Sequence, residues 1–201
     1  MILKYFKAVS STDGTKGTEI KSGELNSLFD TYTKQQQLNG ATKYRKMYIE
    51  SDIDITVNVG ISSIGDYDSL LVISTGDAEV GAGIDPKATK YGAEIIISST
   101  VNSLTFLSTR SGYDVLRASE DFIYNGDIYA ITSIIAGSTD EMVVSFIPSM
   151  TTPPKVGETV TSFIPISLVA NIAVPFWRMN YYPAFFQSAK QYNNTDIITL
   201  V

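Results

Sequence analysis

The chain has 201 residues, a formal net charge of −6, and neither cysteine nor histidine. The missing cysteines exclude disulfides, thiol nucleophiles and thiolate-bound metals, and the missing histidines remove the commonest general base and metal ligand. Nucleic-acid binders normally carry a basic stripe, whereas the one close group of basic residues here is Lys43, Arg45 and Lys46, so we expect no direct nucleic-acid binding.

The first part of the chain predicts a strand, a loop and one helix. Residues 2–10, ILKYFKAVS, are typical of a strand. In residues 22–38, SGELNSLFDTYTKQQQL, Ser22 can cap a helix, and Gly40 follows where helices commonly end. Apolar side chains at three- and four-residue spacing give this segment one apolar stripe: Leu25, Leu28, Phe29 and Tyr32. We therefore expect a short amphipathic helix lying on a sheet.

From residue 41 onward the hydrophobic period changes to two. Residues 44–49 form one expected strand, and residues 52–61 alternate strictly between polar and apolar side chains. The apolar positions are Ile53, Ile55, Val57, Val59 and Ile61. This pattern predicts an antiparallel strand with one wet face. Further strands are expected at residues 69–75, 93–100 and 103–110.

Residues 121–147 predict a three-stranded meander. Asn125-Gly126 lies between two apolar runs and is a strong two-residue hairpin signal, because both residues tolerate positive φ. A second turn is expected at residues 137–140, and residues 148–158 form a loop rich in Pro and Thr. Strands resume at residue 159, and because proline cannot donate to a ladder they should lie at an edge or carry bulges at three positions: Pro165, Pro175 and Pro183.

No residue pattern predicts a catalytic, cofactor or metal site. Asp52 with Asp54, and Asp66 with Asp68, are spaced so that both carboxylates of a pair share one strand face, as a hard cation needs. Neither pair lies in an EF-hand pattern, so a solvated face or a turn is favoured over calcium binding. The glycine-rich stretch GDAEVGAG lacks the Lys-Ser/Thr ending of a phosphate-binding loop.

The stretch AVPFWRMNYYPAFFQ, residues 173–187, concentrates large aromatic side chains on both faces of an expected strand. A subunit interface, a core covered on both sides and a ligand platform all fit this composition. The chain is also poor in charge, at 18%, which fits a surface covered by partners or a β-rich chain full of Ser, Thr and Ile. We predict an interface, with Phe176 and Trp177 on opposite faces, made by these residues: Phe176, Trp177, Arg178, Tyr181, Tyr182, Phe185 and Phe186.

Four segments together resemble a known family. They are GELNSLFDTYT (residues 23–33), YRKMYI (44–49), the alternating strand 53–61 and ANIAVPFWRM (170–179). Their order resembles β-rich structural virion proteins of tailed bacteriophages, of the neck, collar, tail or capsid-decoration class. The resemblance implies that the two flanks of the chain form one β-sandwich and that the middle is a small barrel inserted between its late strands.

We therefore expect an all-β fold, an antiparallel β-sandwich with one short helix and an inserted small β-barrel. The sandwich would comprise residues 1–92 and 161–201, and the barrel residues 93–160. The resemblance implies a non-enzymatic virion component, folded in the host cytoplasm, that contacts other virion proteins and copies of itself. The alternative is a carbohydrate- or receptor-binding module that uses exposed Tyr and Trp. No cofactor is expected. No membrane association is expected either, because no window approaches the roughly 18 apolar residues that cross a bilayer.

Overall fold

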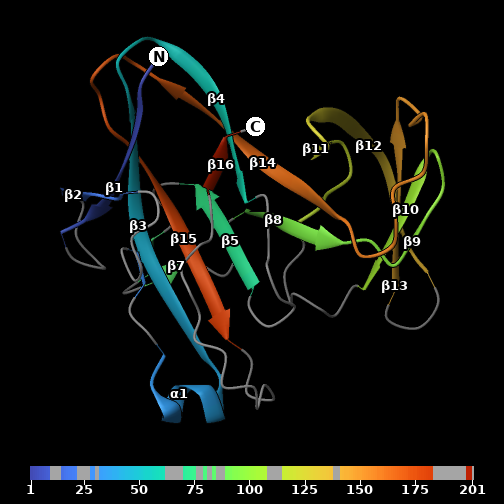
Figure 1. Cartoon of the computed structure of the whole chain (residues 1–201), viewed down its shortest axis with the longest axis horizontal. Helices are drawn as coiled ribbons and strands as arrows, with labels where there is room; N and C mark the ends of the chain where they lie inside the picture. Colours follow the sequence, from blue (N-terminus) through green and yellow to red (C-terminus); the bar gives the residue numbers. More distant parts are fainter. Residues whose placement is uncertain are drawn as a thin grey trace.

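The structure is a computed structural model that describes residues 1–9, 15–21, 28–29, 32–61, 70–75, 79–80, 83–84, 89–107, 115–137, 141–182 and 198–200. Within these residues the chain is all-β apart from one short helix, as predicted (Figure 1). The elements are β1 Leu3–Ala8, β2 Lys16–Glu19, α1 Lys34–Asn39, β3 Ala41–Ser51, β4 Ile55–Ile61, β5 Leu70–Thr75, β6 Glu79–Val80, β7 Gly83–Ile84, β8 Lys90–Ile95, β9 Ser98–Ser99, β10 Ser103–Leu107, β11 Asp121–Tyr124, β12 Asp127–Ala136, β13 Glu141–Ile147, β14 Thr159–Leu168, β15 Val174–Tyr182 and β16 Ile198–Leu200.

One half of the molecule is a sandwich built from both ends of the chain. One layer has the strand order β2-β1-β3-β15-β5-β8. The other layer consists of β14, β4 and β16, with β4 paired to both of its neighbours. Period-two alternation turns one face of each layer inward. The core between the layers is mostly aliphatic and contains Leu28, Phe29, Met47, Ile49, Val57, Val59, Ile164, Ile166, Leu168 and Phe176.

The other half, which we call the distal unit, comprises β9–β13 and the described residues between Ile96 and Glu158. Its strands follow the order β11-β12-β13-β10-β9, so sequence neighbours are mostly sheet neighbours. Three buried rings pack against one another at its centre, with centroids 5.3–5.4 Å apart: Phe122, Tyr129 and Phe146. Aromatic pairs of this geometry stabilise a core beyond the area they bury.

Two strands run from the sandwich into the distal unit and pair with each other (Figure 1). β8 pairs with β5 in the sandwich and with β14, while β14 pairs with β4 in the sandwich and with β11 in the distal unit. The predicted boundaries, 92/93 and 160/161, both fall inside these two strands. The two halves therefore share one continuous sheet of 14 strands.

The predicted barrel is an open, curled sheet among the described residues. β8 pairs with β14 and β9 pairs with β10, but Ile96 and Ile97 separate β8 from β9. Ile96 N–H donates to the Glu158 carbonyl and the Ile96 carbonyl accepts from Gly157 N–H, whereas Ile97 N–H donates to the Thr105 carbonyl on the other side. The bend at these two residues brings the ends of the curled sheet together without a complete ladder.

The helix is shorter than predicted and begins later. Thr33 caps α1, because its hydroxyl accepts a hydrogen bond from Gln36 N–H while the Gln36 side chain accepts one from Thr33 N–H. This reciprocal capping box competes well with a start further upstream. Gly40 ends the helix with φ 73°, as predicted. The predicted cap Ser22 lies outside the described residues, and the predicted stripe is buried in part before the helix begins, at Leu28, Phe29 and Tyr32.

The hairpin and proline predictions are confirmed for the described residues. Asn125 and Gly126 have φ 51° and 89° and join β11 to β12. Among the described strands, Pro165 in β14 has a paired neighbour on one side, in β4, and Pro175 in β15 has one on one side, in β3. A missing N–H is tolerated at such positions. Pro183 lies outside the described residues.

Candidate functional site

β15 is covered on both of its faces by the chain itself. Phe176 points into the sandwich core, and Trp177 belongs to the buried cluster that contains the distal aromatic rings. Both side chains are fully buried. Their opposite orientation is as predicted, but neither faces a partner. The two-sided core, one of the three interpretations left open, explains the large residues on both faces here.

Two buried cationic side chains, Lys46 on β3 and Arg178 on β15, also make contacts within the chain. Arg178 lies opposite Arg45 in the ladder, and its guanidinium carbon is 5.6 Å from the centre of the Phe29 ring. The Lys46 ammonium lies 6.0 Å from the centre of the Trp177 ring, on the other face. Aromatic faces attract cations, which favours both placements.

The predicted interface residues therefore divide into two groups. Phe176, Trp177 and Arg178 are buried inside the chain, so their assignment to a subunit interface is corrected: Phe176 and Trp177 lie in the two cores, and Arg178 lies beside Phe29. Tyr181 and Tyr182 lie in β15, where the backbone pairs with Thr42 and Ala41, and their side chains are outside the description. Phe185 and Phe186 lie outside the described residues, so the interface prediction stays open for these four aromatics.

The acidic pair Asp52 and Asp54 caps backbone groups at the β3–β4 turn. An Asp52 carboxylate oxygen accepts a hydrogen bond of 2.7 Å from Ile2 N–H, and an Asp54 oxygen accepts one of 2.8 Å from Ala170 N–H. The alternating stretch 52–61 had placed this pair on the polar face of a strand, and the structure corrects that placement to a turn, because β3 ends at Ser51 and β4 begins at Ile55. No group of three or more potential metal ligands occurs in the part of the chain that the structure describes, and the pair Asp66 and Asp68 lies outside it.

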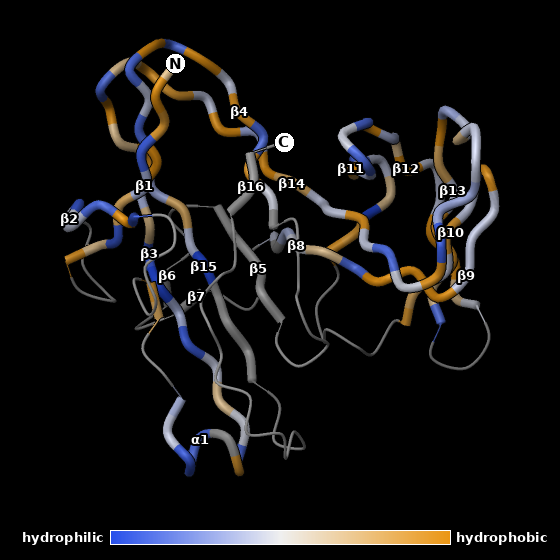
Figure 2. Tube along the Cα trace, in the orientation of Figure 1, coloured by the Kyte–Doolittle hydropathy of each residue, from blue (hydrophilic) through white to orange (hydrophobic). Residues whose placement is uncertain are grey.

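These same bonds gather three chain segments at one end of the sandwich and expose apolar side chains there. The segments are the N-terminal residues, the β3–β4 turn and the β14–β15 turn, close to the label N in Figure 1. Five side chains, between 45% and 68% exposed, make up what we call the apex: Met1, Ile2, Ile53, Val169 and Ile172. Figure 2 shows hydrophobic positions on the loops at this end of the molecule.

The apex is held by a backbone network. Asn171, with φ 60°, donates its N–H to the Ser51 carbonyl at 2.7 Å, and Ile172 N–H donates to the Val169 carbonyl at 3.0 Å. The Ser51 hydroxyl accepts from Ile53 N–H at 3.1 Å. Buried and half-buried backbone groups satisfied in this way keep a turn in one conformation.

Sequence reasoning missed the apex. Ile53 was interpreted as the first member of the apolar face of an alternating strand, but β4 begins at Ile55 and Ile53 is exposed in the turn before it. The signal that could have found it is Ser51-Asp52, since short polar side chains cap turns and interrupt a strand.

Comparison of the chain with protein-family models, with curated proteins and with solved structures found no match. Among the described residues, no helix has the length and apolar character needed to cross a membrane.

Proposed function

We propose that this chain is a non-enzymatic structural component of a tailed-bacteriophage virion, which joins or decorates the head, neck or tail through protein–protein interfaces. The observation that carries the proposal is the apex, a group of exposed apolar side chains on a rigid end of the sandwich. The resemblance of four segments of the chain to β-rich virion proteins of tailed bacteriophages is the reason for proposing a virion as the assembly in which the apex makes its contact.

The apex has the properties of a contact surface. Covering the exposed half of each of its five aliphatic side chains is worth roughly 1 kcal/mol per side chain. The network through Asp52, Asp54 and Ser51 fixes the three segments in advance, so little conformational entropy is lost on binding. A total of roughly 5 kcal/mol does not exceed the cost of association on its own, so the apex suits a particle in which several contacts act together.

The alternative, a carbohydrate- or receptor-binding module, loses its best stacking residue. Trp177 is fully buried beneath the distal unit and cannot lie against a sugar ring. The exposed side chains of the apex are aliphatic, and such side chains offer no aromatic face.

Mass spectrometry of purified particles tests the proposal directly, and its companion is a set of matched variants. We expect the wild-type chain in particles, and we expect Ile53→Asp and Ile172→Asp to reduce its incorporation by about tenfold or more, because a desolvated carboxylate would face the partner. Val156→Asp is the control, since Val156 is 70% exposed in a loop of the distal unit. Absence of the wild-type chain from particles would overturn the proposal. Normal incorporation of both apex variants would show that the apex is not the surface through which the chain joins the particle.

A further inference from the structure

The distal unit carries a second surface, formed by the outward side chains of β10, β12 and β13. Inward positions such as Leu104, Phe106, Val144 and Phe146 are buried, so the alternate positions point outward. We call this set the outer face: Ser103, Thr105, Leu107, Ile128, Ala130, Ser133, Ile135, Glu141, Val143, Ser145 and Ile147. Ile135 and Ile147 are 59% and 58% exposed.

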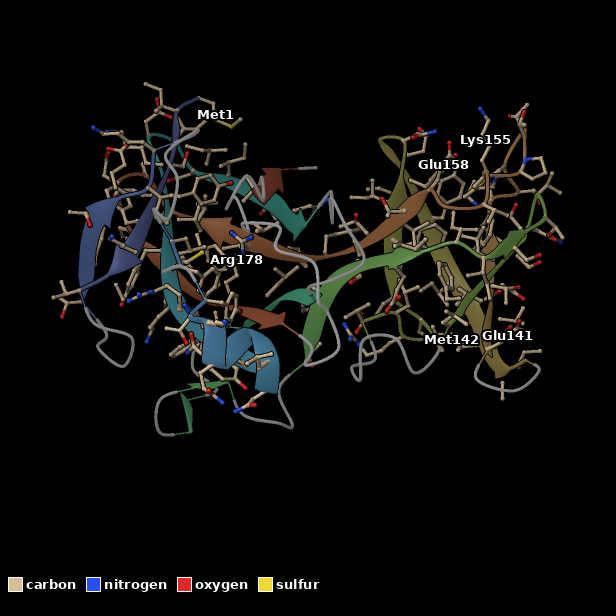
Figure 3. All side chains as sticks on the ribbon, turned by 60° about the horizontal axis from the view of Figure 1, so that its bottom comes forward. Met1, Glu141, Met142, Lys155, Glu158 and Arg178 are labelled. Atoms are coloured by element: carbon tan, nitrogen blue, oxygen red, sulfur yellow. The ribbon has the colours of Figure 1, made fainter. Side chains whose placement is uncertain are left out.

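The outer face is nearly uncharged in a chain of net charge −6. Glu141, at one corner and labelled in Figure 3, is its one ionisable side chain, and exposed Asp121 of β11 borders it beside Ala130. The wet face of an antiparallel sheet normally carries polar and charged residues. A face of Ile, Val, Leu, Ala, Ser and Thr is therefore unusual for solvent. Its centre, around Ser145, carries no charge, so two copies of an acidic chain can meet there with little like-charge repulsion.

The residues of the outer face are arranged in a pattern that complements itself. Three serines lie side by side across the strands, since Ser145 pairs with Ser103 on one side and with Ser133 on the other. Along β13 this row lies between two apolar positions, Val143 and Ile147. Serine hydroxyls both donate and accept hydrogen bonds, so a row of serines can pair with an identical row. An apolar–hydroxyl–apolar order also reads the same in both directions, as contact across a two-fold axis requires.

We propose that the outer face docks on the outer face of a second copy of this chain. The two sheets would stack face to face, about 10 Å apart. A two-fold axis in the plane of contact and across β13 places Ser145 opposite Ser145 of the second copy and keeps the two Glu141 side chains apart. The inference rests on the proposed function for its setting, a particle in which other contacts already hold copies side by side.

The size of the surface explains why the particle setting matters. With strands about 4.8 Å apart and outward residues about 6.7 Å apart along each strand, the outer face covers roughly 300–400 Å². Stable pairs bury about 800 Å² per partner, so the contact is weak between free copies and becomes effective when neighbours are held in place.

Sedimentation equilibrium of the full chain, at concentrations up to about 1 mM, tests the proposal outside any particle. We expect the average mass of the wild type to rise with concentration. Ser145→Arg and Ser145→Glu should each weaken association by about tenfold or more, because like charges would meet across the axis. An equimolar mixture of the two variants should associate again, which also shows that both are folded. Thr151→Arg, in an exposed loop after β13, should behave as the wild type.

Two results would overturn the inference. One is a wild-type chain that stays monomeric throughout the series, and the other is a Ser145→Arg variant that associates as the wild type does. If the wild type is monomeric and Ser145→Arg alone is lost from particles, a different protein covers this face. Because the solution experiment needs no particle, its outcome is separate from the presence or absence of the chain in virions.

Discussion

The sandwich and the distal unit differ in how the chain builds them. The sandwich core joins strands from both ends of the sequence, as when β15 pairs with β3 and β14 with β4. The distal unit stacks consecutive hairpins around three aromatic rings. Local pairings are reached early in folding, whereas pairings between distant segments first incur the loop-closure cost. The distal unit is thus built mostly from local pairings, while Trp177 and the strands β8 and β14 couple it to the sandwich.

Excision of residues 93–160 would remove the distal unit altogether and has the largest expected effect. The ends to be joined already lie together, since Gly92 N–H donates to the Ser162 hydroxyl at 2.9 Å and that hydroxyl donates to the Gly92 carbonyl at 3.1 Å. Because Gly92 faces Ser162, two inserted residues followed by Thr161 form a three-residue hairpin turn that connects β8 to β14 in the native register. We expect a folded sandwich that has lost roughly 2–3 kcal/mol, because Trp177 loses its cover.

Urea unfolding followed by circular dichroism measures this loss, and Trp177→Thr supplies its control. In the full chain we expect Trp177→Thr to cost about 3–5 kcal/mol, as for other large aromatic side chains removed from a core. In the excised chain the same substitution should cost much less, since the indole is already in water. An excised chain with no cooperative unfolding transition would show that the flanks do not form a domain alone.

Much of the fold could be predicted because its signals are local. The alternation in residues 55–61 and the Asn125-Gly126 turn report the backbone of their own segments, and both are observed. The length of the helix was wrong because Thr33 and Gln36 form a capping box that competes with the cap expected at Ser22. When two local signals both predict a helix start, the outcome depends on which residues the packing of the sheet leaves available. A local sequence pattern does not contain this information.

The surfaces were harder to predict because burial is set by distant segments. A large side chain such as Trp177 suits an interface and a core equally well until the cover from the distal unit is known. Ile53 has the same character as Ile55, yet the entry of the chain into β4 leaves it in the turn. The outer face was not predicted, since its row of serines arises from the register of three strands rather than from any one of them.

Substitution of one glycine in each half should have an intermediate effect on stability, for different reasons. A Cβ at Gly60, in β4, would lie 2.8 Å from the Thr161 methyl group, so we expect Gly60→Ala to cost about 1–3 kcal/mol through overpacking. A Cβ at Gly126, in the distal hairpin, would meet nothing within 4 Å, but φ is 89°, so Gly126→Ala should cost about 1–2 kcal/mol through backbone strain.

Thr161→Ser separates the two causes, because it removes the methyl group and keeps the hydroxyl. It should relieve most of the cost of Gly60→Ala and none of the cost of Gly126→Ala, as measured by urea unfolding of the single and double variants. A Gly60→Ala variant that Thr161→Ser does not rescue would mean that the sandwich adjusts elsewhere to the new methyl group.

The smallest expected effect concerns pH and lies in the distal unit. The Tyr124 hydroxyl donates to a Glu158 carboxylate oxygen that also accepts from Lys155 N–H at 2.8 Å (Figure 3 labels Lys155 and Glu158). The bond from Tyr124, followed by that from Lys155, lowers the pKa of Glu158 below its ordinary value. Burial, followed by the bond to Glu158, raises the pKa of Tyr124 to about 12.

The signs of the two shifts predict opposite pH dependences. Because the pKa of Glu158 is lowered in the folded state, its contribution to stability is present above its ordinary pKa and is lost as pH falls through the folded value. Because the pKa of Tyr124 is raised, its contribution is present below about pH 10 and is lost as pH rises toward about 12. Tyr124→Phe should therefore move the pKa of Glu158 back toward its ordinary value, which an NMR titration of the carboxyl carbon measures. In a Glu158→Gln background Tyr124→Phe should leave the acid side of the stability profile unchanged, and a remaining acid-side effect there would assign the pH dependence to other groups of the distal unit.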